Sequence, residues 1–308
     1  MDINRYSPSY ILDKKHLIGL SDYSTEEIFE LLYATKALKR KFEAHEETNI
    51  LHGTTVALLF ADTSLRTRSA IEIGTHQLGG SCVDLPYSDK DMHAGENVKD
   101  IVNVISRYGV SALVTRGINK KLLKEFTAIS SMPIINSHND DCVPIQALSD
   151  LFTIWEKKGE LAGVKLAVVG RATSMTSSFV IGAVKCGMDV SLACPARYGL
   201  KRENMEAAEQ LGKIYTTDNP IEAVRDADVV YTNAYRYHTV ISDEEKEIFA
   251  PYRVDAGLMS YAKHNSVFMH PLPATRGQEV TADVIDGKHS IVYDQGENRL
   301  HTIKAIFT

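Results

Sequence analysis

Short apolar runs alternate with amphipathic segments along most of this chain, and no other feature of the sequence restricts the fold as strongly. The first series predicts strands at 54–60, at a run ending at 85, at 112–115 and at 133–136, and helices at 22–42, 68–78, 98–108 and 120–128. Strands that alternate with helices form a parallel sheet whose two faces are covered by the helices. This half of the chain therefore predicts a doubly wound α/β domain.

A second series of the same kind follows. It predicts strands at 165–169, 189–193, 228–231 and 266–269, with helices from 176 onward and at 203–211. One long helix at 145–158 separates the two series, and an apolar pattern at helical spacing returns at 298–307. A length of 308 residues suits two domains of ordinary size. We predict a first domain of residues 1–147, completed by a C-terminal helix at about 297–308, and a second domain of residues 148–296.

Composition argues against several classes of protein. The chain is 44% hydrophobic and 24% charged with a net charge of −6, as in soluble globular proteins, and nucleic acid is not expected as a main partner. No apolar stretch approaches membrane-spanning length, and the N-terminus lacks a signal-peptide core. The four cysteines lack CxxC spacing and the 11 histidines lack HExxH spacing. We therefore expect a cytoplasmic protein with reduced thiols, no metal and no membrane contact.

Basic and hydroxyl side chains crowd into residues 64–68, directly after the apolar run at 54–60. The order is Ser64-Leu65-Arg66-Thr67-Arg68. Free backbone N–H groups and the positive end of the helix dipole make a strand-to-helix corner suitable for an anion. Hydroxyls add neutral donors, and an arginine adds a planar fork that matches two phosphate oxygens. The alternative interpretation is a helix N-cap followed by solvated arginines.

Several well-known cofactor and nucleophile motifs are absent. Gly170-Arg171-Ala172-Thr173-Ser174 lacks the later glycines of GxGxxG, and neither GxxxxGK[ST] nor GxSxG occurs. The chain is therefore expected to use no cofactor. Chemistry by positioning and electrostatics is favoured over a covalent intermediate.

Other polar groups follow the predicted strands, where ligands of open parallel sheets bind. Arg116 is interpreted either as a solvent-facing strand-end residue or as a ligand of the same anion, and Gln146 as a helix cap. The two prolines of His270-Pro271-Leu272-Pro273 leave backbone carbonyls free to accept hydrogen bonds from an amine or amide. Arg299 is either a surface charge at a helix start or a clamp. We expect these groups to meet in a cleft between the two domains.

Taken in order, these residues resemble the aspartate/ornithine carbamoyltransferase family. The resemblance covers nearly the whole chain and rests on five segments: Ser64-x-Arg66-Thr67-Arg68, Arg116, Pro144-x-Gln146-Ala147-Leu148-x-Asp150, His270-Pro271-Leu272-Pro273 and Glu297-Asn298-Arg299-Leu300-His301. It implies transfer of the carbamoyl group of carbamoyl phosphate to an amine, with release of phosphate. It also implies a homotrimer whose neighbouring subunit completes each active site with a loop, here at 88–96.

The resemblance also implies roles for individual residues. Carbamoyl phosphate would be bound by Ser64, the backbone of Leu65, Arg66, Thr67, Arg116, Gln146, the carbonyl of Leu272, and Arg299. Arg116 would bridge the phosphate and the carbonyl oxygen, while Gln146 and Leu272 would hold the carbamoyl NH₂. Arg116, Thr67, Gln146 and Leu272 are thus the expected catalytic groups, because pre-aligned donors stabilise the charge that develops during transfer.

Two departures from the family pattern bear on activity. The family usually reads His-Pro-x-Gln, with a histidine that donates to the carbamoyl oxygen, but this chain has Val143 there, and His138 lies five residues earlier. The acceptor segment matches neither the ornithine nor the aspartate branch. Its expected residues are Ser174, Asn233, Arg236, Tyr237, His238 and Pro271.

We therefore expect a small amino-acid-like acceptor that is neither ornithine nor aspartate, with an anionic group paired to Arg236 or Arg171. Three alternatives stay open. The first is a divergent ornithine carbamoyltransferase. The second is a regulatory homologue that binds carbamoyl phosphate but has lost catalysis through Val143, and the third is a phosphate-ester enzyme on a similar scaffold.

Overall fold

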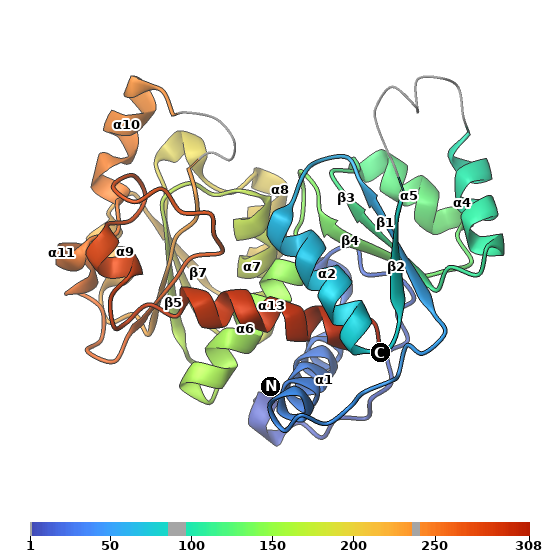
Figure 1. The fold of residues 1–308 in the computed structure, drawn as a ribbon. Coiled ribbons are helices and arrows are strands. Elements are labelled where there is room, and N and C mark those ends of the chain that lie inside the picture. The colour runs from blue at the N-terminus through green and yellow to red at the C-terminus, as the bar shows by residue number, and fades with distance from the viewer. Residues whose placement is uncertain (1, 86–96, 236–240) are drawn as a thin grey trace. The chain divides into compact units, whose positions relative to one another are not determined.

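The chain forms two compact domains in a computed structural model that describes residues 2–85, 97–235 and 241–308 (Figure 1). The N-terminal domain comprises residues 7–152 and 299–308, and the C-terminal domain comprises the first six residues with 153–298. The boundaries fall inside helix α6 (Pro144–Lys158) and helix α13 (Val292–Ile306). The N-terminal residues join the C-terminal domain because Asn4 donates to the carbonyl of Gly159 and accepts from the indole of Trp155.

The N-terminal domain is built on a four-stranded parallel sheet in the order β2-β1-β3-β4. Its strands are β1 (Thr55–Phe60), β2 (Ser81–Leu85), β3 (Ala112–Arg116) and β4 (Ile134–His138). Its helices are α1 (Thr25–Glu43), α2 (Leu65–Gln77), α4 (Val98–Arg107) and α5 (Lys120–Ile129), with parts of α6 and α13. Val102 of α4 and Phe126 of α5 pack with Leu59 and Leu113 of the sheet, so these two helices cover one face.

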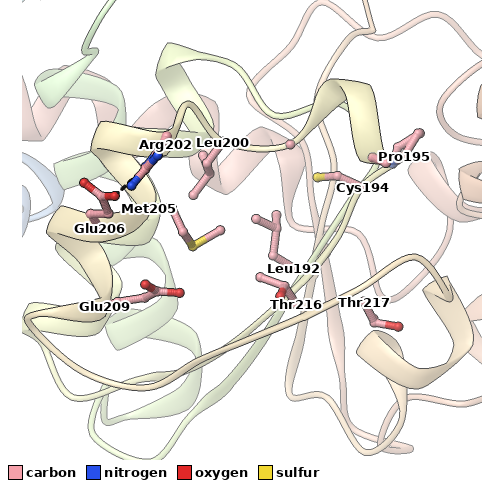
Figure 2. A pocket seen from close by; sticks show the side chains of 12 residues that line it. Leu192, Cys194, Pro195, Leu200, Arg202, Met205, Glu206, Glu209, Thr216 and Thr217 are labelled. Atoms are coloured by element: carbon pink, nitrogen blue, oxygen red, sulfur yellow. Dashed lines mark hydrogen bonds and ion pairs between the residues drawn. The ribbon is translucent and has the colours of Figure 1, made fainter.

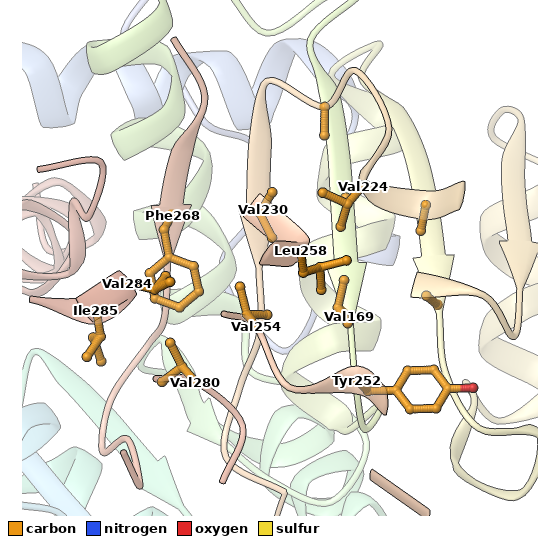
Figure 3. Close-up of a cluster of buried hydrophobic side chains, with 14 of the residues drawn as sticks. Val169, Val224, Val230, Tyr252, Val254, Leu258, Phe268, Val280, Val284 and Ile285 are labelled. Carbon is orange, nitrogen blue, oxygen red and sulfur yellow. The ribbon is translucent and has the colours of Figure 1, made fainter. Parts of the chain in front are cut away.

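The C-terminal domain contains a five-stranded parallel sheet in the order β7-β6-β5-β8-β9. Its strands are β5 (Lys165–Val169), β6 (Asp189–Ala193), β7 (Ile214–Thr217), β8 (Val229–Tyr231) and β9 (Val267–Met269). Its helices are α7 (Ser174–Lys185), α8 (Arg202–Glu209), α9 (Pro220–Val224), α10 (Asp243–Phe249), α11 (Ala256–Met259) and α12 (Ala282–Ile285). Figure 3 shows Val169, Val230 and Phe268 of three strands gathered with Val254 and Leu258 in one apolar cluster.

The prediction of two doubly wound parallel-sheet domains is confirmed. Strand β7 and the short helices α9, α10, α11 and α12 were not predicted from the sequence. Helix α2 begins at Leu65, three residues before the predicted start, so the basic segment occupies its first turn. Helix α13 begins at Val292, so Arg299 lies inside a helix and not at a helix start.

Each sheet has one point at which the strand order reverses, and such points are where open α/β sheets bind ligands. In the N-terminal domain the reversal falls between β1 and β3, and in the C-terminal domain between β5 and β8. The loops that leave these four strands begin at Ala61, Gly117, Gly170 and Thr232. The predicted anion corner, and Ser174 and Asn233 of the predicted acceptor residues, therefore lie at the two reversal points.

Within the described part of the chain, no helix is both long and apolar enough to cross a membrane. The same residues contain no group of three or more His, Cys, Asp or Glu side chains placed to hold a metal ion.

Candidate functional site

The anion corner of the N-terminal domain is formed by the loop after β1 and the first turn of α2. Ser64 stands at the N-cap with an extended backbone (φ −150°), but its side chain makes no capping hydrogen bond to the helix. The first turn of α2 contains no acidic side chain, and its N–H groups have no partners within the helix. This geometry supports an anion site over a simple N-cap, because the hydroxyl of Ser64 is not used to close the helix.

Arg116 lies beside this corner at the end of β3. Its Cα pairs in register with that of Phe60, and the N–H of Ala61 donates to its carbonyl at 2.9 Å. The Arg116 side chain is only 16% exposed, and its Nε lies 2.5 Å from Oδ1 of Asp62. The interpretation of Arg116 as a solvent-facing arginine is therefore wrong, since its guanidinium is held against the loop that carries Ser64.

The three neighbouring residues of α2 differ in their surroundings. Arg66 is exposed, and the side chain of Leu65 is 80% exposed, so neither is packed into the core. Arg68 instead turns toward the sheet, where its Nη1 lies 2.7 Å from Oδ1 of Asp84 and its guanidinium stacks over Phe60. Arg66 is thus the more exposed arginine of the pair, and Arg68 is held against the sheet.

Gln146 and Arg299 meet inside the N-terminal domain. Gln146 is buried in the first turn of α6, where its amide donates to Oδ1 of Asp150 at 2.5 Å and its carbonyl oxygen accepts from Nη2 of Arg299. The side chain of Arg299 is buried as well. The interpretation of Arg299 as a surface charge at a helix start is therefore wrong. The three side chains form a buried chain of hydrogen bonds that fixes the orientation of the glutamine amide.

In the C-terminal domain, buried polar groups hold the backbone of Leu272 in place. Nδ1 of His270 accepts from the N–H of Leu272 at 2.9 Å, which puts the ring proton on Nε2, 3.2 Å from Oε1 of Glu279. The same carboxylate oxygen accepts from the N–H of Thr275 at 2.6 Å. Leu272 has a positive φ of 54°, a conformation that costs a residue with a side chain about 1–3 kcal/mol. His270 and Glu279 thus act as positioning residues for the carbonyl of Leu272.

Replacing Glu279 with alanine is expected to lower the free energy of unfolding by about 1–3 kcal/mol, because the N–H of Thr275 loses its acceptor and the buried ring of His270 loses a neighbouring carboxylate. We expect Glu279→Ala to raise the KM for carbamoyl phosphate more than Glu279→Gln does. The side-chain amide of glutamine keeps an oxygen that faces Thr275 and His270, and alanine does not. Chemical denaturation and steady-state kinetics measure both effects. Equal KM values in the two variants would contradict a positioning role for Glu279.

The acceptor segment predicted in the C-terminal domain is partly described. Ser174 is the first residue of α7, and the amide of Asn233 donates to the hydroxyls of Thr173 and Thr176 at 3.1 and 3.0 Å. The Oδ1 atom of Asn233 is buried and has no hydrogen-bond partner among the described residues. Pro271 is buried beside His270. The predicted residues Arg236, Tyr237 and His238 lie outside the described residues.

Arg171 does not present an unpaired charge to an anionic acceptor. Its Nη1 lies 3.2 Å from Oε1 of Glu245 and donates to the carbonyl of Tyr235 at 3.0 Å. Its guanidinium also stacks over the rings of Tyr198 and Phe249. The structure therefore gives Arg171 a role in holding the loops around the end of β5.

A separate hollow of about 440 Å³ lies between α8 and the ends of β6 and β7 (Figure 2). Arg202 and Glu206, which line it, form an ion pair at 2.6 Å, and Cys194 is another lining residue. Burial raises the pKa of the Cys194 thiol to about 12, so the thiol stays protonated and is no nucleophile at neutral pH. None of the predicted site residues lines this hollow, and it offers no evident chemistry.

The fold and these side chains define a two-domain α/β protein. It has the anion corner at the end of one sheet, and the buried amide of Asn233 with the hydroxyls of Thr173 and Thr176 at the end of the other. The family model described as "Aspartate/ornithine carbamoyltransferase, carbamoyl-P binding domain" matches residues 15–156. The model described as "Aspartate/ornithine carbamoyltransferase, Asp/Orn binding domain" matches residues 162–308. The chain belongs to the aspartate/ornithine carbamoyltransferase family and is a carbamoyltransferase.

Individual relatives agree with this assignment. The chain is 42% identical over 299 residues to an ornithine carbamoyltransferase of Bacillus subtilis, covering 95% of this chain and 92% of the relative. The solved ornithine carbamoyltransferase of Pyrococcus furiosus superimposes with a TM-score of 0.90 at 38% identity, covering 95% of both chains. An aspartate transcarbamoylase of Trypanosoma cruzi, at 23% identity and a TM-score of 0.81, covers 99% of this chain and 98% of its own and shares the fold.

Proposed function

We propose that this protein transfers the carbamoyl group of carbamoyl phosphate to a primary amine of a small amino-acid-like acceptor and releases phosphate. The observation that carries the proposal is the placement of Arg116 against the loop that leads into α2, at the reversal point of the first sheet. A partly buried guanidinium, held by a loop that leads to a helix N-terminus, suits a phosphoryl group joined to a polarised carbonyl.

In this mechanism the protein acts by orientation and charge. Ser64, Arg66 and Thr67 hold the phosphate, and Arg116 spans the phosphate and the carbonyl oxygen. The amine attacks the carbonyl carbon, and negative charge grows on that oxygen and on the departing phosphate. Fixed donors stabilise this charge without reorganising, and binding both substrates replaces a slow encounter by an oriented one. The carbamoyl NH₂ group is assigned to Gln146 and to the carbonyl of Leu272.

The second part of the proposal is the identity of the acceptor. Several relatives at about 40% identity are named ornithine carbamoyltransferases, which does not support the sequence-based expectation that ornithine is excluded. The divergent acceptor segment still argues for a test that goes beyond ornithine. We therefore propose an acceptor with one reacting primary amine and place ornithine first among the compounds to be tried.

The test is turnover of carbamoyl phosphate by the purified protein with ornithine, lysine, aspartate and a series of aliphatic diamines. Phosphate release and the mass gain of the carbamoylated product are both measured, against a reaction without acceptor. Product from any one amine supports the proposal. Binding of carbamoyl phosphate without product from any amine would instead favour a regulatory homologue, the second candidate, for which the valine at position 143 is the supporting observation.

We also propose a homotrimer, on the family resemblance alone. Residues 88–96, predicted to complete the site of a neighbouring subunit, lie outside the described residues. Light scattering during size-exclusion chromatography gives the mass directly. A trimer is about three times the chain mass of 34.2 kDa.

A further inference from the structure

His138 lies next to Arg116, although the two residues are far apart in the sequence. Strand β4 contains an irregularity at this point, because Thr115 pairs with Asn136 whereas Arg116 pairs with His138. Ser137 is thus the extra residue, and its hydroxyl donates to the carbonyl of Thr115 at 2.9 Å. Such bulges re-aim side chains and are frequent next to active sites. Without it, Ser137 and not His138 would stand beside Arg116.

The same carboxylate contacts both residues. Oδ1 of Asp62 lies 2.5 Å from Nε of Arg116, and Oδ2 lies 3.9 Å from Nδ1 of His138. Nδ1 of His138 is buried and has no hydrogen-bond partner among the described residues, while the side chain as a whole is 26% exposed. The exposure therefore falls on the rest of the ring, which carries Nε2. A 3.9 Å separation is too long for a hydrogen bond, but catalytic pairs are often this loose without substrate and tighten when it binds.

The surroundings of His138 favour a neutral ring. Burial and the charge of Arg116 lower its pKa, against the smaller opposing effects of Asp62 and of Asp140 in the turn after β4. With the proton of a neutral ring on Nδ1, toward Asp62, Nε2 carries a lone pair. A neutral imidazole oriented by a carboxylate is a general base.

We propose that His138 is the general base that removes the proton of the attacking amine, with Asp62 as its positioning residue. The inference rests on the proposed function, because the amine must approach the carbonyl carbon whose oxygen Arg116 holds. The amine nitrogen forms a bond to that carbon, the bond from the carbon to the phosphate oxygen breaks with its electron pair, and the proton leaves nitrogen for Nε2 of His138.

The test compares His138→Gln with His52→Gln, an exposed histidine just before the opposite end of β1. We expect His138→Gln to lower kcat about 10²- to 10⁴-fold and the control to leave it unchanged. In the wild type, kcat/KM should fall as the pH drops through the lowered pKa of His138, because the protonated ring cannot accept a proton. That acid limb should vanish in His138→Gln.

Two further variants keep the inference testable if His138→Gln folds poorly. Asp62→Asn removes a charge that raises the pKa of His138, so the acid limb should move to lower pH. Free imidazole should restore part of the activity of His138→Ala. An unchanged acid limb in His138→Gln, or restoration of its activity by Val143→His, would overturn the assignment of a base. Lack of wild-type turnover with every amine would instead contradict the proposed function itself.

Discussion

Replacing Arg116 with methionine is expected to lower kcat/KM for carbamoyl phosphate about 10³-fold, since the variant loses a preorganised donor to the oxygen on which charge develops. The guanidinium is tied to the loop after β1 through Asp62 and lies at the reversal point of the sheet. The methionine side chain has a similar length but carries no charge and no hydrogen-bond donor. Phosphate release at saturating acceptor measures the loss.

The matched control is Arg68→Met, which removes the same charge from the same corner. Arg68 forms an ion pair with Asp84 and stacks on Phe60. Its replacement should therefore lower the free energy of unfolding slightly and leave kcat/KM close to the wild-type value. A similar loss of activity in both variants would show that only the overall positive charge matters. Near-normal activity of Arg116→Met would contradict the role of Arg116 in the reaction.

Gln146→Leu is expected to lower kcat about 10²-fold, because the amide that is assigned to the carbamoyl NH₂ disappears. Leucine also interrupts the buried chain of hydrogen bonds between Asp150 and Arg299, which should lower the free energy of unfolding by about 1–3 kcal/mol. Kinetics are therefore measured at a temperature where denaturation curves show both proteins folded.

Gln77→Leu is the control for this prediction. Gln77 also accepts a hydrogen bond from a cation of α13, the Nζ of Lys304 at 3.1 Å, but it ends α2 and is not a predicted site residue. Its replacement should affect stability without changing kcat. Loss of kcat in both variants would mean that the contacts of α13, and not the amide of Gln146, govern activity.

The strands that carry the anion corner could be predicted because they are continuous apolar runs. Residues 56–60 of β1 are buried throughout, as central strands of a parallel sheet are. Strand β7 at the sheet edge is Ile-Tyr-Thr-Thr and half exposed, so it shows no such run. Helices α9 to α12 span four to seven residues each, which is too short for a clear helical period.

The contacts that define the site were harder to predict from the sequence. Arg116 pairs with Asp62, which lies 54 positions away, and no local sequence pattern predicts this contact. His138 reaches Arg116 only through the irregularity at Ser137, which no turn or breaker residue marks. Arg299 was interpreted either as a surface charge at a helix start or as a clamp, but α13 begins at Val292 and continues through Gly296. The types of residue were predicted, and the tertiary register that brings them together was not.

The central claim is that the corner between β1 and α2 binds carbamoyl phosphate together with Arg116. Calorimetric titration of carbamoyl phosphate into the protein without acceptor tests it most directly, with Arg66→Met/Arg116→Met as the comparison. We predict saturable binding of one carbamoyl phosphate per chain to the wild type, and no measurable binding to the double variant. Equal binding to both proteins, or none to the wild type, would contradict this claim.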